Sequence, residues 1–125
     1  MTKKIDANTK CLYDTIAEWP NVDGNCNDFV SVEVSVVFNR LDHLSMCYGV
    51  SGKDLEEEYG DDDLEYFVDV RRDQMPKLAS KFSARDGETL IRRIAERFGP
   101  YKQNAYGKFM AFLDKKGIVY TTIMY

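Results

Sequence analysis

Residues Phe29 to Phe38 read FVSVEVSVVF, and this stretch decides the fold. Its even positions are apolar, while positions 31, 33 and 35 are Ser, Glu and Ser. A period of two is typical of a β-strand with one buried face. The alternation resumes after a short connection at 39–41, with an apolar side made of Leu44, Met46, Tyr48 and Val50 and a polar side made of His43, Ser45, Cys47 and Gly49. The two segments predict an antiparallel hairpin.

Two more strands follow from pattern and composition. Every second residue of Leu64–Val70 is apolar, so one face of this segment is expected to be buried. Ile118–Met124 is rich in β-branched and aromatic residues and follows Gly117, a common helix stop. The sequence therefore predicts about four strands.

Between these last two strands the apolar residues recur with the period of a helix. The three stripes are Met75, Leu78, Ala79 and Phe82; Leu90, Ile91, Ile94, Ala95 and Phe98; and Ala105, Phe109, Phe112 and Leu113. Asp73 and Asp86 are expected to cap the first two helices, and Gly99-Pro100 to end the second. Gly107 would lie inside the third helix, where we attribute it to close packing.

The opening segment, Asn8–Trp19, fits two structures. Leu12, Ile16 and Trp19 have helical spacing, whereas the Tyr, Thr and Trp content also suits an edge strand. We favour the helix. The predicted architecture is then α+β: an antiparallel sheet of about four strands with three or four helices packed on one face, in a single domain over residues 1–125.

The composition is that of a globular protein. The 125 residues are 44% hydrophobic, 30% charged and 13% aromatic, which excludes intrinsic disorder. No uncharged stretch approaches the roughly 20 apolar residues that span a bilayer. The start, MTKKIDANTK, lacks the apolar run of a signal peptide, and Cys11, Cys26 and Cys47 have wide, irregular spacing. We therefore expect a cytoplasmic protein without disulfides or a membrane segment.

The sequence carries no catalytic or cofactor motif. His43 and Cys47 share one side of a predicted strand, but their Cα atoms would be roughly 13 Å apart, too far for a nucleophile–base pair. We expect Cys47 to be a buried thiol and His43 a surface residue. Asp23–Asp28 departs from a calcium-binding loop, zinc-site spacing is missing, and no glycine-rich phosphate loop occurs. We expect no metal, no cofactor and no enzymatic activity.

Charge is divided unevenly along the chain. Residues 1–65 hold 15 acids and 5 bases, whereas residues 66–125 hold 6 acids and 12 bases. The densest run, DLEEEYGDDDLE over residues 54–65, has eight carboxylates and no base. It is either a solvated loop or a docking surface for a basic partner. Neighbouring carboxylates in a loop diverge, which argues against a two-metal catalytic site.

Two sets of residues are candidates for binding a macromolecule. The acidic set, in which the tyrosine would be an aromatic anchor, is Glu56, Glu57, Glu58, Tyr59, Asp61, Asp62 and Asp63. The basic set is Arg71, Arg72, Arg92, Arg93 and Arg97, which would suit nucleic acid. The pI of about 5.0 opposes nucleic-acid binding, so we prefer arginines that balance the acidic loop within the molecule.

The order of elements in the second half resembles that of a known class of proteins. A strand LEYFVDV, the helices DQMPKLASKF and GETLIRRIAERFG, and a helix with LDKKGI running into IVYTTIMY follow one another over Leu64–Tyr125. Together they resemble small bacterial immunity proteins of contact-dependent growth inhibition and related polymorphic toxin systems. The resemblance implies a cytoplasmic, non-catalytic protein that binds and neutralises a cognate toxin domain, whose cleft would be basic.

Two other functions remain as alternatives. A nucleic-acid-associated regulatory protein would use the basic set of arginines. A hydrolase or metal enzyme of unrecognised type would have inward-facing carboxylates, or His43 with a carboxylate partner, in a cleft. The sequence leaves the oligomeric state open.

Overall fold

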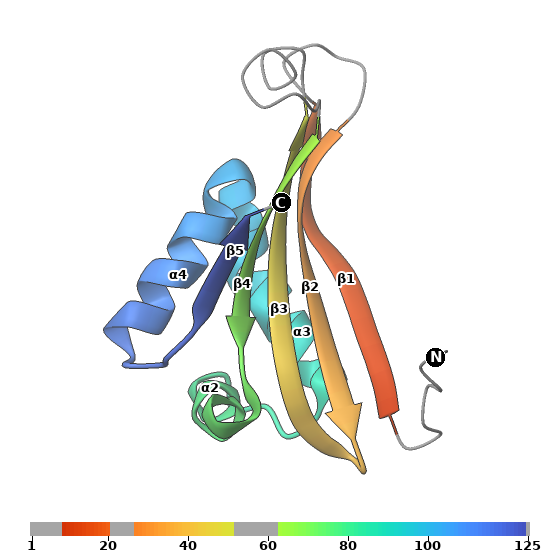
Figure 1. Cartoon of the computed structure of the whole chain (residues 1–125), viewed down its shortest axis with the longest axis vertical. Helices are drawn as coiled ribbons and strands as arrows, with labels where there is room; N and C mark the ends of the chain where they lie inside the picture. The colour runs from red at the N-terminus through yellow and green to blue at the C-terminus, as the bar shows by residue number, and fades with distance from the viewer. Residues whose placement is uncertain (1–8, 21–26, 52–62, 125) are drawn as a thin grey trace.

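The computed structural model describes residues 9–20, 27–51 and 63–124. Five strands form one antiparallel sheet in the order of the chain, β1-β2-β3-β4-β5 (Figure 1). The strands are β1 (Thr9–Pro20), β2 (Asn27–Val37), β3 (Arg40–Ser51), β4 (Asp63–Val70) and β5 (Thr121–Met124). The helices between β4 and β5 are η1 (Arg72–Gln74), α2 (Met75–Lys81), α3 (Gly87–Phe98), η2 (Gly99–Asn104) and α4 (Ala105–Lys115).

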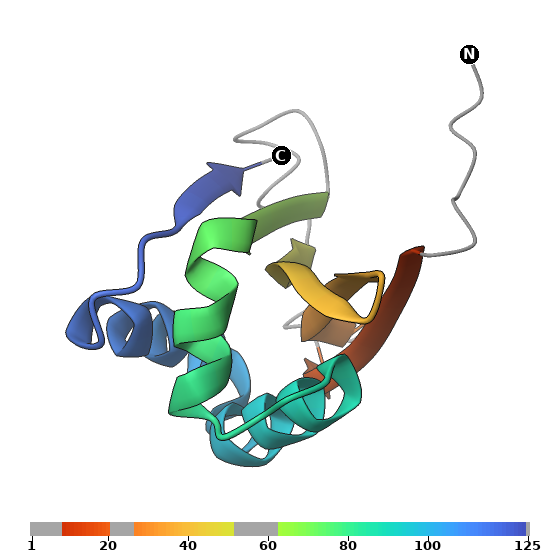
Figure 2. The same ribbon diagram turned by 90° about the horizontal axis from the view of Figure 1, so that it is seen from below.

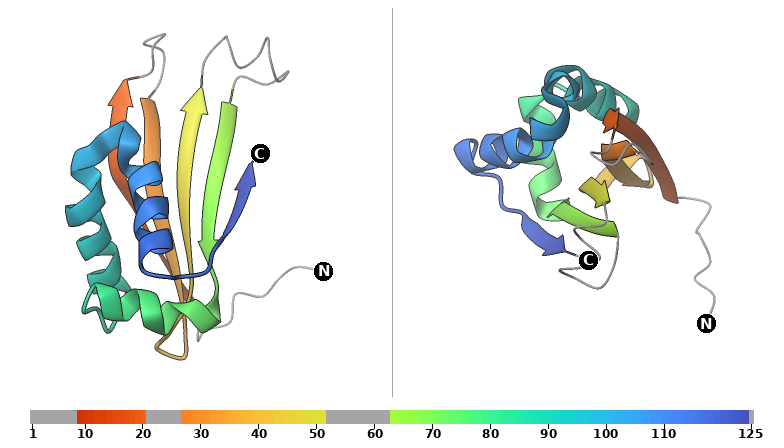
Figure 3. Two further views of the ribbon diagram at one scale, coloured as in Figure 1. Left: turned by 90° about the vertical axis from the view of Figure 1, so that its left-hand side faces the viewer. Right: turned by 90° about the horizontal axis from the view of Figure 1, so that it is seen from above.

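The helices form a second layer on one face of the sheet (Figures 2 and 3). The α+β class and the antiparallel sheet agree with the prediction, but the sheet has five strands where about four were expected. The difference comes from the segment predicted as a fourth helix, Asn8–Trp19: its described residues, from Thr9 on, belong to β1. No helix among the described residues is long and apolar enough to cross a bilayer.

A β-bulge explains why β1 has the spacing of a helix. The pairing with β2 shifts by one residue between Thr15 and Ala17, so Ile16 is the extra residue. Leu12, before the bulge, and Trp19, after it, both pack against the core although their separation is odd. Apolar residues at 12, 16 and 19 therefore share a face without helical backbone.

The core lies between the sheet and the helices. Val30, Val32 and Val34 of β2 and Leu44 and Met46 of β3 have no exposed surface. They meet the apolar stripes of the three helices, whose fully buried members are Met75, Leu78, Leu90, Ile94, Ala105, Phe109 and Leu113. The apolar positions of the alternating pattern thus lie on the side of the hairpin that the helices cover.

Four phenylalanines join the helices to one another. Phe82, Phe98, Phe109 and Phe112 contact each other edge-on or tilted, with ring centroids 5.2–6.3 Å apart. The Arg97 guanidinium lies 4.6 Å from the centroid of the Phe112 ring. Such contacts add to the stability that the buried area itself provides.

Of the two helix caps predicted from the sequence, one is confirmed and one is wrong. Asp86 caps α3, because its carboxylate accepts a hydrogen bond from the Thr89 backbone N–H at 2.7 Å and another from the Thr89 hydroxyl at 3.0 Å. Asp73 does not cap α2: it lies within η1, and Gln74 occupies the cap position without a side-chain bond. Pro76, in the first turn, fixes the backbone angle there instead.

The β2–β3 turn is tighter than predicted. Phe38 and Asn39 both have positive φ, 50° and 63°, as a two-residue type I′ hairpin turn requires. Phe38 was expected on the buried face of the strand, but it lies in the turn and is 66% exposed. The connection was predicted at 39–41, but the turn starts one residue earlier and β3 begins at Arg40, two residues earlier than expected.

Two glycines on the helices have opposite surroundings. A Cβ at Gly99 would lie 2.7 Å from the backbone oxygen of Ile16, the bulge residue of β1. A Cβ at Gly107, within α4, would meet nothing within 4 Å, so the close packing expected there is absent. Gly99 is therefore required by contact between the layers, whereas Gly107 is not.

Replacing each glycine by alanine tests this distinction. Gly107→Ala should raise the free energy of unfolding by about 0.5–1 kcal/mol, because alanine restricts the unfolded chain and favours the helix. Gly99→Ala should lower it by about 1–3 kcal/mol through the clash with the bulge. Urea unfolding followed by circular dichroism gives both values. Equal effects of the two substitutions would contradict the contact at Gly99.

The Asp86 cap should make stability depend on pH. The two bonds from Thr89 lower the pKa of Asp86 below its ordinary value of 3.8. A lowered pKa stabilises the folded state above pH 3.8, and this contribution is lost as the pH falls through the folded pKa. Asp86→Ala should therefore lower the melting temperature at pH 7 and have little effect at pH 2. Asp86→Asn, which can still cap, serves as the control.

Candidate protein-binding surface

The face of the sheet opposite the helices is covered by no described element (Figure 3). We call it the outer face. Strand pairing defines its side chains row by row. One row runs Glu18, Phe29, Gly49 and Glu65; the next runs Thr15, Ser31, Cys47, Phe67 and Ile123; and the third runs Tyr13, Glu33, Ser45, Asp69 and Thr121.

The middle of the outer face is apolar. The Phe29 ring lies across Gly49, where a Cβ would come within 2.3 Å of the ring carbon Cε1. Cys47, in the next row, pairs with Phe67, which in turn pairs with Ile123. Although no helix covers it, Cys47 is only 9% exposed. We call these four side chains, Phe29, Cys47, Phe67 and Ile123, the apolar centre.

Carboxylates on β1, β2 and β4 flank the apolar centre. Glu18, Glu33 and Glu65 are exposed, and Asp69 is half-buried. Glu18 accepts a hydrogen bond from the Asn27 side-chain amide at 2.6 Å. We call the four acids, Glu18, Glu33, Glu65 and Asp69, the acidic rim.

The two layers differ in charge. The five strands carry eight acids and two Lys or Arg residues, whereas residues 71–117, which form the helical layer, carry five acids and 12 bases. The division seen along the sequence is therefore a division in space. The sheet side attracts positively charged molecules, and this attraction weakens with added salt.

His43 has a carboxylate partner on the outer face. Its Nε2 lies 3.5 Å from the Asp69 Oδ1, and the two side chains are 40% and 19% exposed. The shallow depression at His43 is formed by Asp42, Arg71, Arg72 and Asp73 and contains no nucleophile of the Ser, Thr or Cys type. The pair matches one element expected of a hydrolase, without a cleft that would enclose a substrate.

Cys47 is a buried thiol, as expected. Burial, followed by the charge of Glu65, raises its pKa to about 11, against a smaller lowering effect of the hydrogen bond with Ser31. At neutral pH the sulfur is protonated and a poor nucleophile. It belongs to the packing of the apolar centre. Cys11, by contrast, is exposed.

Most of the predicted acidic set lies outside the described residues: Glu56, Glu57, Glu58, Tyr59, Asp61 and Asp62. Asp63 is the first residue of β4 and pairs with Ser51, the last residue of β3. The chain therefore leaves and re-enters the sheet at adjacent positions, next to the row that contains Glu65. Sequence reasoning missed the apolar centre, although aromatic residues at the polar positions of two strands were visible.

Four of the five predicted basic residues are engaged within the molecule. Arg72 pairs with Asp42, and Arg92 with Glu96 at 3.8 Å. Arg93 donates to the Phe82 backbone oxygen at 2.8 Å, and Arg97 stacks on Phe112. Arg72 lies in η1, whereas Arg92, Arg93 and Arg97 lie on α3. These four arginines therefore do not form one basic groove.

Neither metal ligands nor relatives identify the site. Among residues 9–20, 27–51 and 63–124, no three His, Cys, Asp or Glu side chains come together as metal ligands would. No protein-family model, no curated protein and no solved structure matches the chain.

Thiol labelling tests the apolar centre. In a Cys26→Ser background, iodoacetamide at pH 8 should alkylate Cys11 within minutes and leave Cys47 unmodified until the protein unfolds. Mass spectrometry of tryptic peptides over time measures both rates. Ser31→Ala is the matched control, because it removes the hydrogen bond to Cys47 and keeps the phenylalanines in place. Equal alkylation of Cys11 and Cys47 in the folded protein would contradict a covered thiol.

Proposed function

We propose that the protein is a non-catalytic immunity protein that binds and neutralises a cognate bacterial toxin domain through the outer face of its sheet. The observation that carries this proposal is the apolar centre with carboxylates around it, on a face that no described helix covers. Such a surface has the composition of a protein interface, with aromatic side chains in the middle and charged groups at the edge.

The apolar centre and the acidic rim would have separate roles. Phe29 and Phe67 can lose water on contact and supply affinity. Glu33 and Glu65 stay near solvent, where charge mainly accelerates encounter with a basic partner. A protein that must capture a toxin before the toxin acts gains from fast association.

The acidic segment supports the same side of the molecule. Its two ends are fixed at Ser51 and Asp63, one row beyond Glu65 of the acidic rim. The predicted contacts Glu56–Glu58, Tyr59 and Asp61–Asp63 would add further negative charge for a basic partner to meet. The partner we propose is a toxin domain with a basic cleft, met in the cytoplasm.

We rank a nucleic-acid-associated regulator second. Four of the five arginines that it needs already pair with acids, a carbonyl oxygen or an aromatic ring of the same chain. Phosphate binding would have to replace these contacts, while the sheet side repels the nucleic-acid backbone.

Charge removal tests the proposed interface. The partner for the test is the toxin domain encoded beside the protein's own reading frame. Glu33→Ser with Glu65→Ser should lower the association rate constant about tenfold at roughly 20 mM NaCl, and much less at 500 mM, because salt screens steering. Biolayer interferometry measures the rate.

A matched control removes equal charge from the other layer. Glu88→Ser with Glu96→Ser takes two exposed acids from α3 and should leave association nearly unchanged. Serine at all six acids of 56–58 and 61–63 tests the acidic segment separately. Equal slowing by the α3 variant would show that net charge alone acts, and no slowing by the variant with serine at Glu33 and Glu65 would reject the interface.

A further inference from the structure

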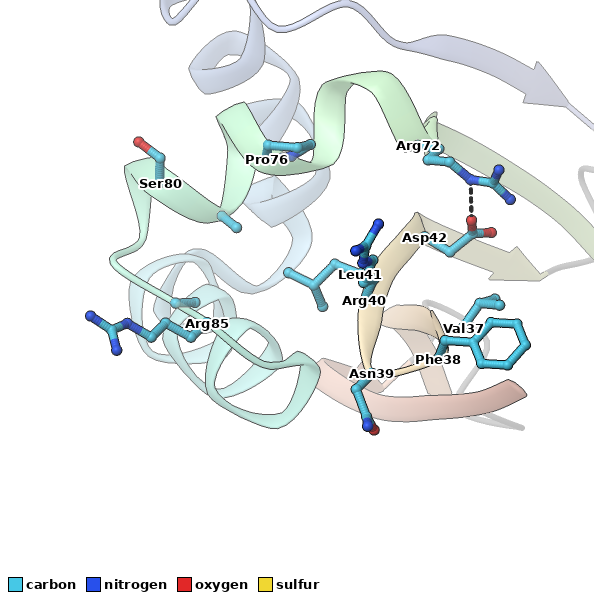
Figure 4. Close-up of a pocket in the computed structure, with 12 residues that line it drawn as sticks. Val37, Phe38, Asn39, Arg40, Leu41, Asp42, Arg72, Pro76, Ser80 and Arg85 are labelled. Atoms are coloured by element: carbon cyan, nitrogen blue, oxygen red, sulfur yellow. Dashed lines mark hydrogen bonds and ion pairs between the residues drawn. The ribbon is translucent and has the colours of Figure 1, made fainter. Parts of the chain in front are cut away.

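A groove at the end of the molecule belongs to neither surface discussed so far. It lies between the β2–β3 turn and α2, at the opposite end of β3 from Ser51, and encloses about 1130 Å³ (Figure 4). Its apolar part consists of Leu41, Pro76, Ala79 and Ala84. A volume of this size accommodates several side chains of a partner.

The groove has a positive charge in a protein whose net charge is −4. Three arginines line it, Arg40, Arg72 and Arg85, against one acid, Asp42. Asp42 pairs with Arg72, and no ion pair with a described residue engages Arg40 or Arg85. Figure 4 shows Arg40 directed from the turn towards α2, whereas Arg85 lies in the connection between α2 and α3 and its guanidinium points away from Leu41. Arg40 thus borders the apolar part without an ion-pair partner among the described residues.

The turn beside the groove exposes an aromatic ring on an unfavourable backbone. Phe38 has a φ of 50°, a region that disfavours bulky residues, and its side chain is 66% exposed. Asparagine or glycine would suit this turn position better. Packing within the described residues does not account for the phenylalanine. Strain of this kind occurs where a side chain has a binding role.

We propose that this groove is a docking site for an acidic peptide segment of a partner protein. A carboxylate of the segment binds Arg40, and an apolar side chain next to it packs on Leu41 and Ala79. Phe38 contacts the partner beside the groove. The site is independent of the outer face, since it needs the opposite charge and lies at the turn end of the sheet.

Peptide titration of the ¹⁵N-labelled protein tests the site. The probes are two capped pentapeptides, one of alternating glutamate and leucine and one of alternating lysine and leucine. The acidic peptide should shift the amide signals of Leu41, Ala79 and Ala84, and Arg40→Gln should weaken its binding at least about fivefold. Lys116→Gln removes an equal charge at the end of α4 and should not weaken binding. No shift up to about 5 mM acidic peptide would overturn the proposal.

Further arms separate the proposal from its alternatives. Equal shifts with the lysine peptide would overturn an acidic peptide as the ligand, because the groove would then not distinguish the sign of charge. Equal shifts with citrate at the same concentration would also overturn it, because binding would then need no apolar side chain. Phe38→Asn should raise the melting temperature and also weaken peptide binding about twofold or more, since it relieves the turn and removes the ring. A higher melting temperature with unchanged affinity would exclude Phe38 from the site.

Discussion

The fold depends on the burial of one face of the β2–β3 hairpin. Val30, Val32, Val34, Leu44 and Met46 are fully buried, and burial of each such side chain is worth roughly 1.5–3 kcal/mol. An isolated hairpin with this pattern would expose its apolar face to water. In the folded protein the apolar stripes of three helices cover that face. The helices occupy one side, and the other side of the sheet is then free to carry a different chemistry.

The sequence predicts the parts of the fold in which local pattern and tertiary contact agree. The alternation in β2 and β3 and the cap at Asp86 are such cases, and both are confirmed. β1 was predicted as a helix because the bulge at Ile16 gives its apolar residues helical spacing, and this bulge arises from the pairing with β2. Gly99, which looks like a helix stop, is needed for contact with that bulge. Neither the bulge at Ile16 nor the contact at Gly99 can be predicted from the residues next to it in the sequence.

The candidate surfaces were predictable to different degrees. Composition alone reveals the acidic run, and strand alternation places Glu33 and Cys47 on one side. The apolar centre depends on which strands are neighbours, because Phe67 approaches Cys47 only through the β3–β4 pairing. The groove combines residues of the sheet and of the helical layer, such as Arg40 and Ala79, and no spacing rule links these residues.

The sheet order has a consequence for how the protein reaches this structure. β1 to β4 pair with their neighbours along the chain, whereas β5 pairs with β4 across the whole helical layer, from Asp69 to Thr121. Closing that long loop is entropically slow compared with forming a hairpin. We therefore expect β5 to join the sheet late in folding and to detach first, so that its amide hydrogens exchange with solvent faster than those of β2.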